Sequence, residues 1–303
     1  MGLLGALRHP HQYIIFLQAR LMRDTEKNER KYLKKLFKYR MKEELDLDNP
    51  ISFNQKIQWL KLYDRNPKYT QLVDKYEVKN YIDDVLGQGY TFPTLSVWDR
   101  FEDIDFEKLP EKFVLKCTHD SGGVVICTDK KYFDKKKAKM KLNWSLKRNY
   151  YINSREWPYK NVKPRIIAEP FMSDDSGKEL NDYKFMCFDG KVKSIFTCTD
   201  RYEKDGLKVT FFDTDWNKMP FERHYPIDKK DIEKPYSYDE MIRIAEKLST
   251  GIPFVRIDFY EINKKPYFGE MTFYPGSGLE EFTPRKWDDV LGNWIKLPSK
   301  RRG

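Results

Sequence analysis

The order of hydrophobic and polar positions divides the chain into a helical first part and a later part rich in strands. Leu33, Leu36, Phe37 and Met41 recur at helical spacing with lysines and arginines between them. We therefore predict a basic, helical region over residues 11–42, an amphipathic helix packed on its own domain or one that contacts a membrane surface or partner. Further helices are predicted within residues 49–64 and 73–87.

From about Glu111 onwards, short apolar runs of strand length are separated by polar turns, which predicts strands. Asp189-Gly190 is a strong signal for a two-residue hairpin turn. The mixture predicts an α+β fold with largely antiparallel sheets. Strands are predicted in residues 94–99, 112–129, 165–172, 179–199 and 254–271, and helices in 134–151 and 237–251.

Composition narrows the class of protein but leaves its partner open. The 303 residues are 40% hydrophobic and 16% aromatic, which indicates a globular protein with two or three core-bearing units. We find neither a membrane-length apolar run nor a signal peptide, so we expect a cytoplasmic protein. The net charge of +10 suits nucleic acid, an anionic membrane surface or an acidic metabolite. Four cysteines without CxxC spacing predict reduced thiols in strands: Cys117, Cys127, Cys187 and Cys198.

The last predicted hairpin raises a question about charge. With a three-residue turn at 263–265, Ile262 pairs with Pro266 and Asp258 lies opposite Glu270. Directly opposed side chains have Cβ atoms about 5 Å apart, and like charges there repel. The arrangement is tolerated if one carboxyl is protonated, if a cation neutralises both, or if the register differs.

A metal ion with a nucleotide is one such cation. Mg²⁺ commonly takes one or two carboxylates together with substrate phosphates. The same register places Arg256 opposite Thr272. Arg256 would then be available to hold a phosphate that the metal does not reach.

A second candidate is the strand that ends in Lys116 and is followed by Gly122 and Gly123. Adjacent glycines let backbone N–H groups approach phosphate oxygens closely, and a lysine adds a positive charge. The lysine precedes the glycines, which excludes a Walker-type loop. A plain hairpin turn is the alternative.

Two further strands carry unusual polar residues. Pro170 donates no hydrogen bond, so the segment around Glu169 leaves the sheet or lies at its edge. Backbone N–H and C=O groups that are not paired within the sheet there can hydrogen-bond the edge of a planar base. The alternative is an edge strand that simply ends at the proline. Asp182, Lys184 and Met186 share one face of the next strand, where a solvated edge is the alternative.

The order of these elements resembles the ATP-grasp superfamily. More narrowly, "NPISFNQKIQWLKLYDRNP", "LVDKYEVKNYI", "KFVLKCTHDSGG", "NDYKFMCFDGKV" and "RIDFYEINKKPYFGEMTFYPGSG" resemble the TupA-like ATP-grasp family of bacterial surface-polysaccharide pathways. The resemblance extends from about Asn49 to Pro284. It implies an ATP-grasp fold in which the nucleotide is held between two α+β subdomains. The implied parts are a helical basic region (1–48), a pre-grasp part (49–110), a small subdomain (111–172) and a C-terminal subdomain with the metal site (173–303).

The resemblance also implies roles for individual residues. ATP and one or two Mg²⁺ ions, for which Mn²⁺ would substitute, are the expected cofactors. One departure is Thr272, where many ATP-grasp enzymes have asparagine, and its hydroxyl is a weaker metal ligand. The implied phosphate and nucleotide contacts are Lys116, Ser121, Gly122, Gly123, Glu169, Pro170, Phe171, Asp182 and Lys184; the metal ligands are Asp258, Glu270 and Thr272; Arg256 and Lys184 act in catalysis.

ATP-grasp enzymes typically join a carboxylate to an amine through an acylphosphate. The resemblance therefore implies a ligase that attaches an amino acid or amine to an acidic glycan or its lipid-linked or nucleotide-linked precursor. We expect any membrane contact to be peripheral, at the inner face, through the basic N-terminal helices. One alternative is a glycosyltransferase, for which Asp213-Thr214-Asp215 offers a DxD pattern. Others are a sugar kinase and a nucleic-acid-binding module, although no recognised nucleic-acid motif is present and we expect no nucleic-acid partner.

Overall fold

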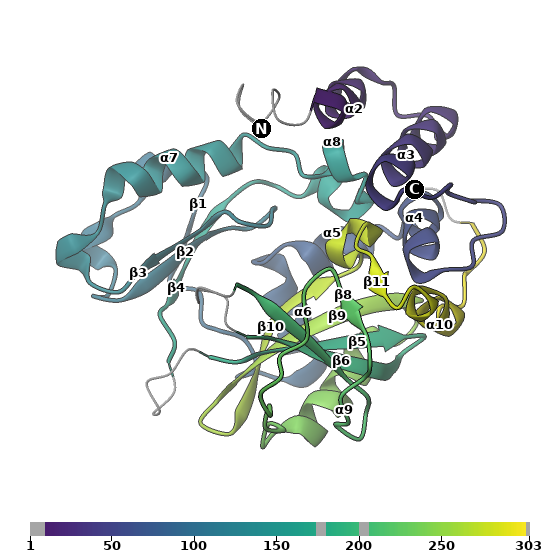
Figure 1. Cartoon of the computed structure of the whole chain (residues 1–303). Coiled ribbons are helices and arrows are strands. Elements are labelled where there is room, and N and C mark those ends of the chain that lie inside the picture. The colour runs from purple at the N-terminus through teal and green to yellow at the C-terminus, as the bar shows by residue number, and fades with distance from the viewer. Residues whose placement is uncertain (1–9, 174–179, 200–205, 301–303) are drawn as a thin grey trace.

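The computed structural model describes residues 10–173, 180–199 and 206–300. In this part of the chain, helices come first, then a four-stranded sheet, then a five-stranded sheet (Figure 1). All strand pairings within these two sheets are antiparallel. The prediction of an α+β fold with largely antiparallel sheets and a helical N-terminal region is therefore confirmed.

The N-terminal helices are built into the main hydrophobic core. Tyr32, Leu33, Leu36 and Phe37 form the buried stripe of one helix, whose N-cap Thr25 accepts a hydrogen bond from the Asn28 backbone N–H. Residues 26–41 thus form an ordinary amphipathic helix packed on its own domain. The helices of this part are α2 (Pro10–Leu21), α3 (Glu26–Met41), α4 (Phe53–Tyr63), α5 (Lys68–Val73) and α6 (Glu77–Leu86).

The smaller sheet has its own hydrophobic core, which α7 (Lys135–Leu146) covers through Ala138 and Leu142. Its strands lie in the order β1-β4-β2-β3. Strand β1 and the buried side chains of Phe101 and Phe106 belong to this unit. These residues come before Glu111, where we predicted the small subdomain to begin. The strands are β1 (Ser96–Trp98), β2 (Phe113–Cys117), β3 (Val124–Cys127) and β4 (Ile166–Pro170).

The larger sheet packs one face against α9 (Tyr238–Ser249), which buries Met241, Ala245 and Leu248. Asp189 and Gly190 both have positive φ (50° and 77°), so β5 and β6 are joined by the predicted two-residue turn. The strand order is β10-β9-β5-β6-β7. These strands are β5 (Asp182–Phe188), β6 (Lys191–Thr199), β7 (Lys208–Phe212), β9 (Phe254–Ile262) and β10 (Lys265–Thr272).

In the β9–β10 hairpin, Asp258 and Glu270 pair as predicted, but the turn differs from the predicted one. Its turn has two residues, Asn263 and Lys264, both with positive φ, so the predicted three-residue turn and the Ile262–Pro266 pair are wrong. Ile262 pairs with Lys265 instead. A β-bulge at Gly269 then shifts the ladder by one residue.

The bulge has a direct consequence for the charged residues. Beyond it, Asp258 pairs with Glu270 and Arg256 pairs with Thr272, as predicted. A Cβ atom at position 269 would lie 3.1 Å from the Asp258 carbonyl oxygen, which explains why glycine occupies this position.

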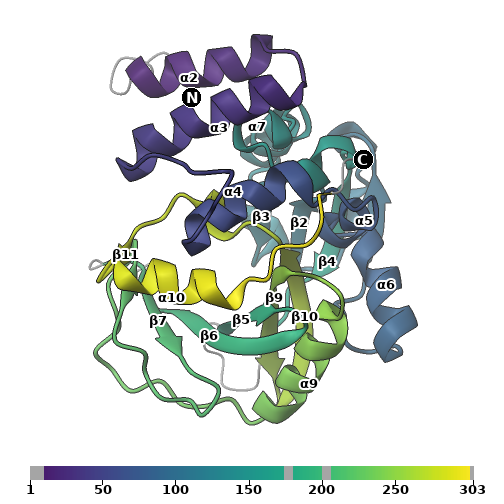
Figure 2. The same cartoon turned by 90° about the vertical axis from the view of Figure 1, so that its right-hand side faces the viewer.

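The remaining helices and strands are short or lie outside the two larger sheets. Helix α10 (Lys286–Trp294) lies against α4, and both are seen together in the rotated view (Figure 2). Within the described residues, no helix combines the length and the hydrophobicity needed to cross a bilayer. The other short elements are η1 (Phe101–Asp103), η2 (Phe106–Lys108), η3 (Lys130–Tyr132), α8 (Tyr151–Ser154), η4 (Trp157–Asn161), β8 (Glu222–Arg223), η5 (Pro275–Gly278) and β11 (Phe282–Thr283).

Candidate active site

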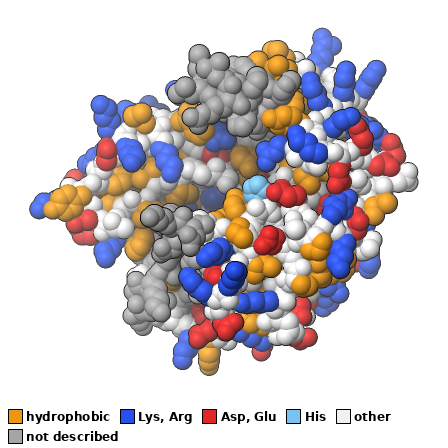
Figure 3. Space-filling view, in the orientation of Figure 1, with side chains coloured by type: hydrophobic (Ala, Val, Ile, Leu, Met, Phe, Trp, Pro, Cys, Tyr) orange, Lys and Arg blue, Asp and Glu red, His pale blue; other side chains and the backbone are white. Residues whose placement is uncertain are grey.

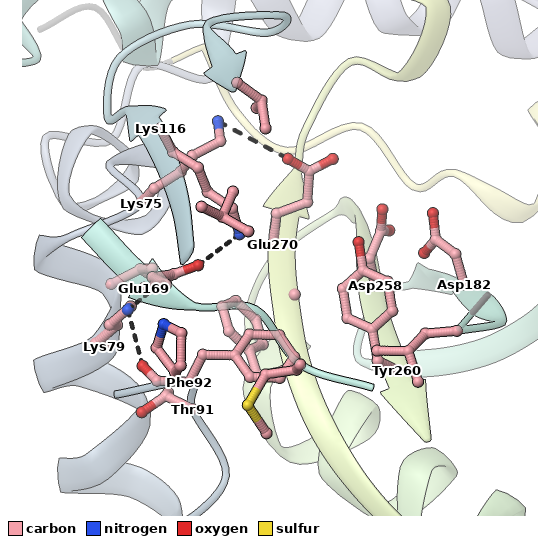
Figure 4. A pocket seen from close by; sticks show the side chains of 18 of the residues that line it. Lys75, Lys79, Thr91, Phe92, Lys116, Glu169, Asp182, Asp258, Tyr260 and Glu270 are labelled. Atoms are coloured by element: carbon pink, nitrogen blue, oxygen red, sulfur yellow. Dashed lines mark hydrogen bonds and ion pairs between the residues drawn. The ribbon is translucent and has the colours of Figure 1, made fainter. Parts of the chain in front are cut away.

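A cavity of about 550 Å³ is lined by residues of both sheets and of the segment around α6. Lys75, Lys79, Lys116 and Glu169 lie on one side of it, Asp182, Asp258 and Tyr260 on the other, and Glu270 between them (Figure 4). Most of the residues singled out from the sequence therefore converge on one place. Those that line the cavity are Lys116, Ser121, Gly122, Glu169, Pro170, Phe171, Asp182, Lys184, Asp258 and Glu270.

One wall is organised around the buried carboxylate of Glu169. Lys79 Nζ and Lys116 Nζ each lie 2.5 Å from one of its two oxygens. Burial alone would raise the pKa of Glu169, but the two lysines outweigh it and lower the pKa below its ordinary value. Two cations around one carboxylate leave this wall with a net positive charge, which suits a phosphate group.

The proline at the end of β4 marks the point where one neighbouring strand stops. Strand β4 is an inner strand, but β1 reaches only to Ala168, whose carbonyl accepts from the Leu95 N–H. The backbone nitrogen of Pro170, two residues further along, points to the same side of β4 as the Ala168 carbonyl. Because β1 no longer pairs there, the missing N–H of proline costs no hydrogen bond. The prediction of an edge therefore holds only locally. Phe92, Phe171 and Tyr260 also line the cavity, and such aromatic walls suit a planar base.

The opposite wall is a row of charged residues across three neighbouring strands. Lys184 on β5 pairs with Asp258 on β9, which pairs with Glu270 on β10. Lys184 Nζ lies 2.6 Å from Asp258 Oδ2 and 2.5 Å from Asp182 Oδ2. The opposed carboxylates Asp258 and Glu270 are thus in the predicted register, and two cations of the protein contact this row of carboxylates.

Arg256 is the second of these cations. It donates two hydrogen bonds to Asp258, of 2.6 and 2.7 Å, and one of 2.9 Å to Glu270 Oε1. It also donates to Thr272 Oγ1 at 3.0 Å. Neither Arg256 nor Thr272 lines the cavity. In this arrangement Arg256 positions the two carboxylates, and Thr272 in turn positions Arg256.

Glu270 is the carboxylate most open to a ligand. Its side chain is 40% exposed, and Oε2 lies 4.0 Å from Lys75 Nζ. Burial would raise its pKa, but Lys75, Arg256 and Lys184 outweigh that effect and lower the pKa to about 2. Glu270 is therefore ionised throughout the physiological pH range.

The donor set fits a hard divalent cation that arrives with a nucleotide. Glu270 and Asp258 supply carboxylate oxygens on one wall of a cavity whose other wall carries lysines for phosphates. Mg²⁺ typically combines one or two carboxylates with phosphate oxygens and waters. Among the described residues, no group of three or more His, Cys, Asp or Glu side chains is placed to hold a metal. Phosphate oxygens and waters would complete the coordination.

The profile of the TupA-like ATP-grasp family matches residues 55–296 of the sequence. The chain belongs to this family. The resemblance inferred from the motifs is thereby confirmed, and with it the assignment of the fold as ATP-grasp.

Solved structures of ATP-grasp ligases resemble this TupA-like protein in fold alone. D-Alanine–D-alanine ligase from Helicobacter pylori has a TM-score of 0.43 at 16% identity, with 84% of this chain and 69% of that chain covered. The ATP complex of the Bacillus anthracis enzyme has a TM-score of 0.39 at 15% identity, covering 80% of this chain and 65% of that one. The ligase PsnB in complex with its minimal precursor, Mg and ADP has a TM-score of 0.40 at 9% identity, covering 80% and 66%. Among curated proteins, no significant match was found.

Two lysines of the TupA-like protein's cavity were missed from the sequence. Lys79 lies on α6, a helix predicted within residues 73–87, and Lys75 lies in the turn just before it. Lys79 contacts Glu169, and Lys75 Nζ donates to the Asp120 carbonyl at 2.7 Å. The other lining residues that we had not singled out are Val78, Thr91, Phe92, Val114, Val124, Ile126, Met172, Leu180, Tyr260, Phe268 and Gly269.

The two adjacent glycines have different structural roles. Gly122 has a φ of +101° with open space around its Cα, and it lines the cavity. Gly123 does not line the cavity. A Cβ there would meet Ser145 Oγ at 2.4 Å and Asp120 Oδ1 at 2.6 Å. Gly123 is therefore required by packing beneath the loop rather than by an approach to phosphate.

We expect Gly123→Ala to lower the free energy of unfolding by about 3 kcal/mol, because the added methyl group overlaps three neighbouring atoms. Gly122→Ala meets no atom within 4 Å, so only its backbone conformation is strained, at about 1 kcal/mol. Urea unfolding of both variants measures the difference. Equal losses would contradict the packing role of Gly123.

The DxD pattern has a local explanation. Asp213 Oδ1 accepts hydrogen bonds of 2.9 Å from the backbone N–H groups of Asp215 and Asn217, and Oδ2 accepts one from the Asn217 side chain. None of these residues lines the cavity. The pattern thus stabilises the turn after β7 and gives no support to a glycosyltransferase metal site.

Proposed function

We propose that this protein is an ATP- and Mg²⁺-dependent carboxylate–amine ligase. The observation that carries the proposal is the pairing of a lysine-lined wall with the Asp258–Glu270 wall across one cavity. In the proposed reaction an acceptor carboxylate oxygen attacks the γ-phosphorus of ATP, and the bond to the β-phosphate oxygen breaks to release ADP. An amine then attacks the acyl carbon of the acylphosphate, loses a proton and displaces inorganic phosphate.

The residues around the cavity would have different roles in this reaction. Lys116 and Lys79 would bind phosphate oxygens, and Phe92, Phe171 and Tyr260 would flank the base. Glu270 and Asp258 would hold Mg²⁺, which neutralises phosphate charge during transfer. Lys184 and Arg256 align Asp258, since each lies within hydrogen-bonding distance of it, and their charges oppose the rise in its pKa that burial causes.

For the substrates, we propose an acidic sugar of a bacterial surface polysaccharide or its precursor as the acceptor, and an amino acid or amine as the donor. Family membership supports this assignment, because TupA-like proteins occur in such pathways. The net charge of +10 is consistent with an acidic acceptor.

The test supplies the purified protein with ATP, Mg²⁺, a uronic acid and a mixture of amino acids. ADP release that needs both co-substrates, together with an amide seen by mass spectrometry, is the expected result. Phosphate retained on the sugar would instead show a kinase. Consumption of a UDP-sugar without ATP turnover would show a glycosyltransferase.

We also propose that α2 brings the protein to the inner face of the membrane. Ile14, Leu17 and Leu21 follow one another at helical spacing and are 48%, 38% and 84% exposed. Arg20 lies on the same helix. In Figure 3, hydrophobic side chains are visible at the position of α2.

Leu21→Glu is expected to weaken binding to anionic phospholipid vesicles by about tenfold, since it removes an apolar contact and adds a repulsive charge. Gln18→Glu, an exposed position of the same helix, is the matched control for charge. Co-sedimentation with vesicles measures both variants. Equal binding by the two variants would refute the contact.

A further inference from the structure

A second cavity, of about 520 Å³, lies among α2, α3, the segment that follows α7, and η5. Its charged lining is entirely basic: Arg20, Arg40, Lys147 and Arg148. The remaining polar residues of its lining are neutral. They are Asn149, Tyr150, Asn153, Ser154 and Ser277.

These four cations differ from Lys79 and Lys116 of the first cavity, which both contact Glu169, although Arg40 lies near enough to Glu281 to help lower its pKa. Within the described residues, none of them has a carboxylate oxygen within 4.0 Å. Arg148 stacks on the Trp144 ring, with 4.3 Å between its guanidinium carbon and the ring centroid. Four like charges gathered around one cavity repel one another, and an anion placed there would relieve that repulsion.

The second cavity is connected to the proposed active site along the chain. Ser277 of η5 lines it, five residues after Thr272 at the end of β10. Lys61 Nζ fixes this loop with hydrogen bonds of 2.7 Å to both Ser277 O and Ser277 Oγ. Tyr150 forms part of the cavity wall. Its pKa is raised by the charge of Glu156, by burial and by the charge of Glu270, so it lies within electrostatic reach of the first site.

We infer that this second cavity binds an anionic group, a phosphate or carboxylate, carried by the sugar acceptor. The inference rests on the proposed ligase function and names where its acceptor is held. The cavity also has apolar parts, Phe16, Leu36, Ile152 and Leu279, against which the C–H faces of a sugar ring pack favourably. Amide and hydroxyl groups beside the cations provide hydrogen-bonding partners for sugar hydroxyls.

A pair of matched double variants tests the assignment. Arg40→Ala/Lys147→Ala removes two exposed cations that line the cavity. Lys34→Ala/Lys141→Ala removes two exposed lysines of α3 and α7 that line neither cavity. Both double variants change the net charge by the same amount, so a general electrostatic effect would act on both alike.

Binding is measured by calorimetry with two probes, glucose 1-phosphate for the phosphate and tetragalacturonate for the carboxylate. We expect at least one probe to bind wild-type protein, and the probe that binds identifies the anionic group. The cavity variant should bind it about tenfold or more weakly, while the control changes less than about twofold. ATP affinity should stay the same in all three proteins, which shows that they are folded.

Equal weakening in the two double variants would overturn the inference, as would failure of both probes to bind wild-type protein at millimolar concentration. The acceptor-site inference and the ligase proposal can each fail without the other, and the experiments distinguish the two failures. Probe binding in this cavity without any amide product would refute the ligase alone. Amide formation with an acceptor KM unchanged in the cavity variant would refute the acceptor site alone.

Discussion

Glu270→Gln is expected to lower ATP-dependent turnover by at least about 100-fold, because it removes a charge placed to stabilise phosphate transfer. Glu270 is the exposed member of the Asp258–Glu270 pair, and its pKa of about 2 keeps it ionised at every practical pH. The glutamine amide oxygen can still accept the hydrogen bond from Arg256, so the wall should keep its shape. Steady-state ADP release at increasing Mg²⁺ concentration measures the effect.

Glu281→Gln is the matched control for this change. It removes an exposed carboxylate that pairs with His224 and does not line the cavity. We expect near wild-type turnover from it. Turnover by Glu270→Gln within about threefold of wild type would show that the carboxylate row does not serve phosphate transfer, since loss of a charge-stabilising group has a far larger effect.

Lys116→Met should weaken ATP binding by about tenfold to 100-fold, the range expected for one charge-assisted contact to phosphate. Methionine has nearly the length and volume of the lysine stem. Glu169 would keep Lys79 as its partner, at 2.5 Å, so the buried carboxylate is not left alone. Titration with a fluorescent ATP analogue measures the affinity.

Lys112→Met provides the comparison for that variant. Lys112 is exposed immediately before β2, and its backbone carbonyl accepts a hydrogen bond from the Phe171 N–H. Both substitutions remove one positive charge from the same segment of chain. Equal loss of affinity in the two variants would mean that Lys116 acts through net charge and not through contact with the nucleotide.

The Asp258–Glu270 pair shows what local sequence patterns can and cannot predict about strand pairing. Counting outwards along two alternating strands from an assumed three-residue turn predicted that these carboxylates oppose each other, and they do. The turn that seemed to fix this register was predicted with one residue too many. The bulge at Gly269 compensated for the difference, so the prediction was correct at the site and wrong at the turn. A bulge depends on how the two strands pair, and their separate hydrophobic patterns do not reveal it.

Most of the helices and strands, and six of the eight charged residues around the first cavity, could be predicted from the sequence alone. Hydrophobic periodicity and turn residues act over a few positions, so they are readable along the chain. Only the tertiary structure decided that Lys79 shares Glu169 with Lys116, 37 residues further along the chain, and that Arg256 lies behind the carboxylates instead of facing the cavity. It alone gathered Arg20, Arg40, Lys147 and Arg148 around the second cavity. Such groupings come from packing between segments far apart in sequence, for which no short-range pattern exists.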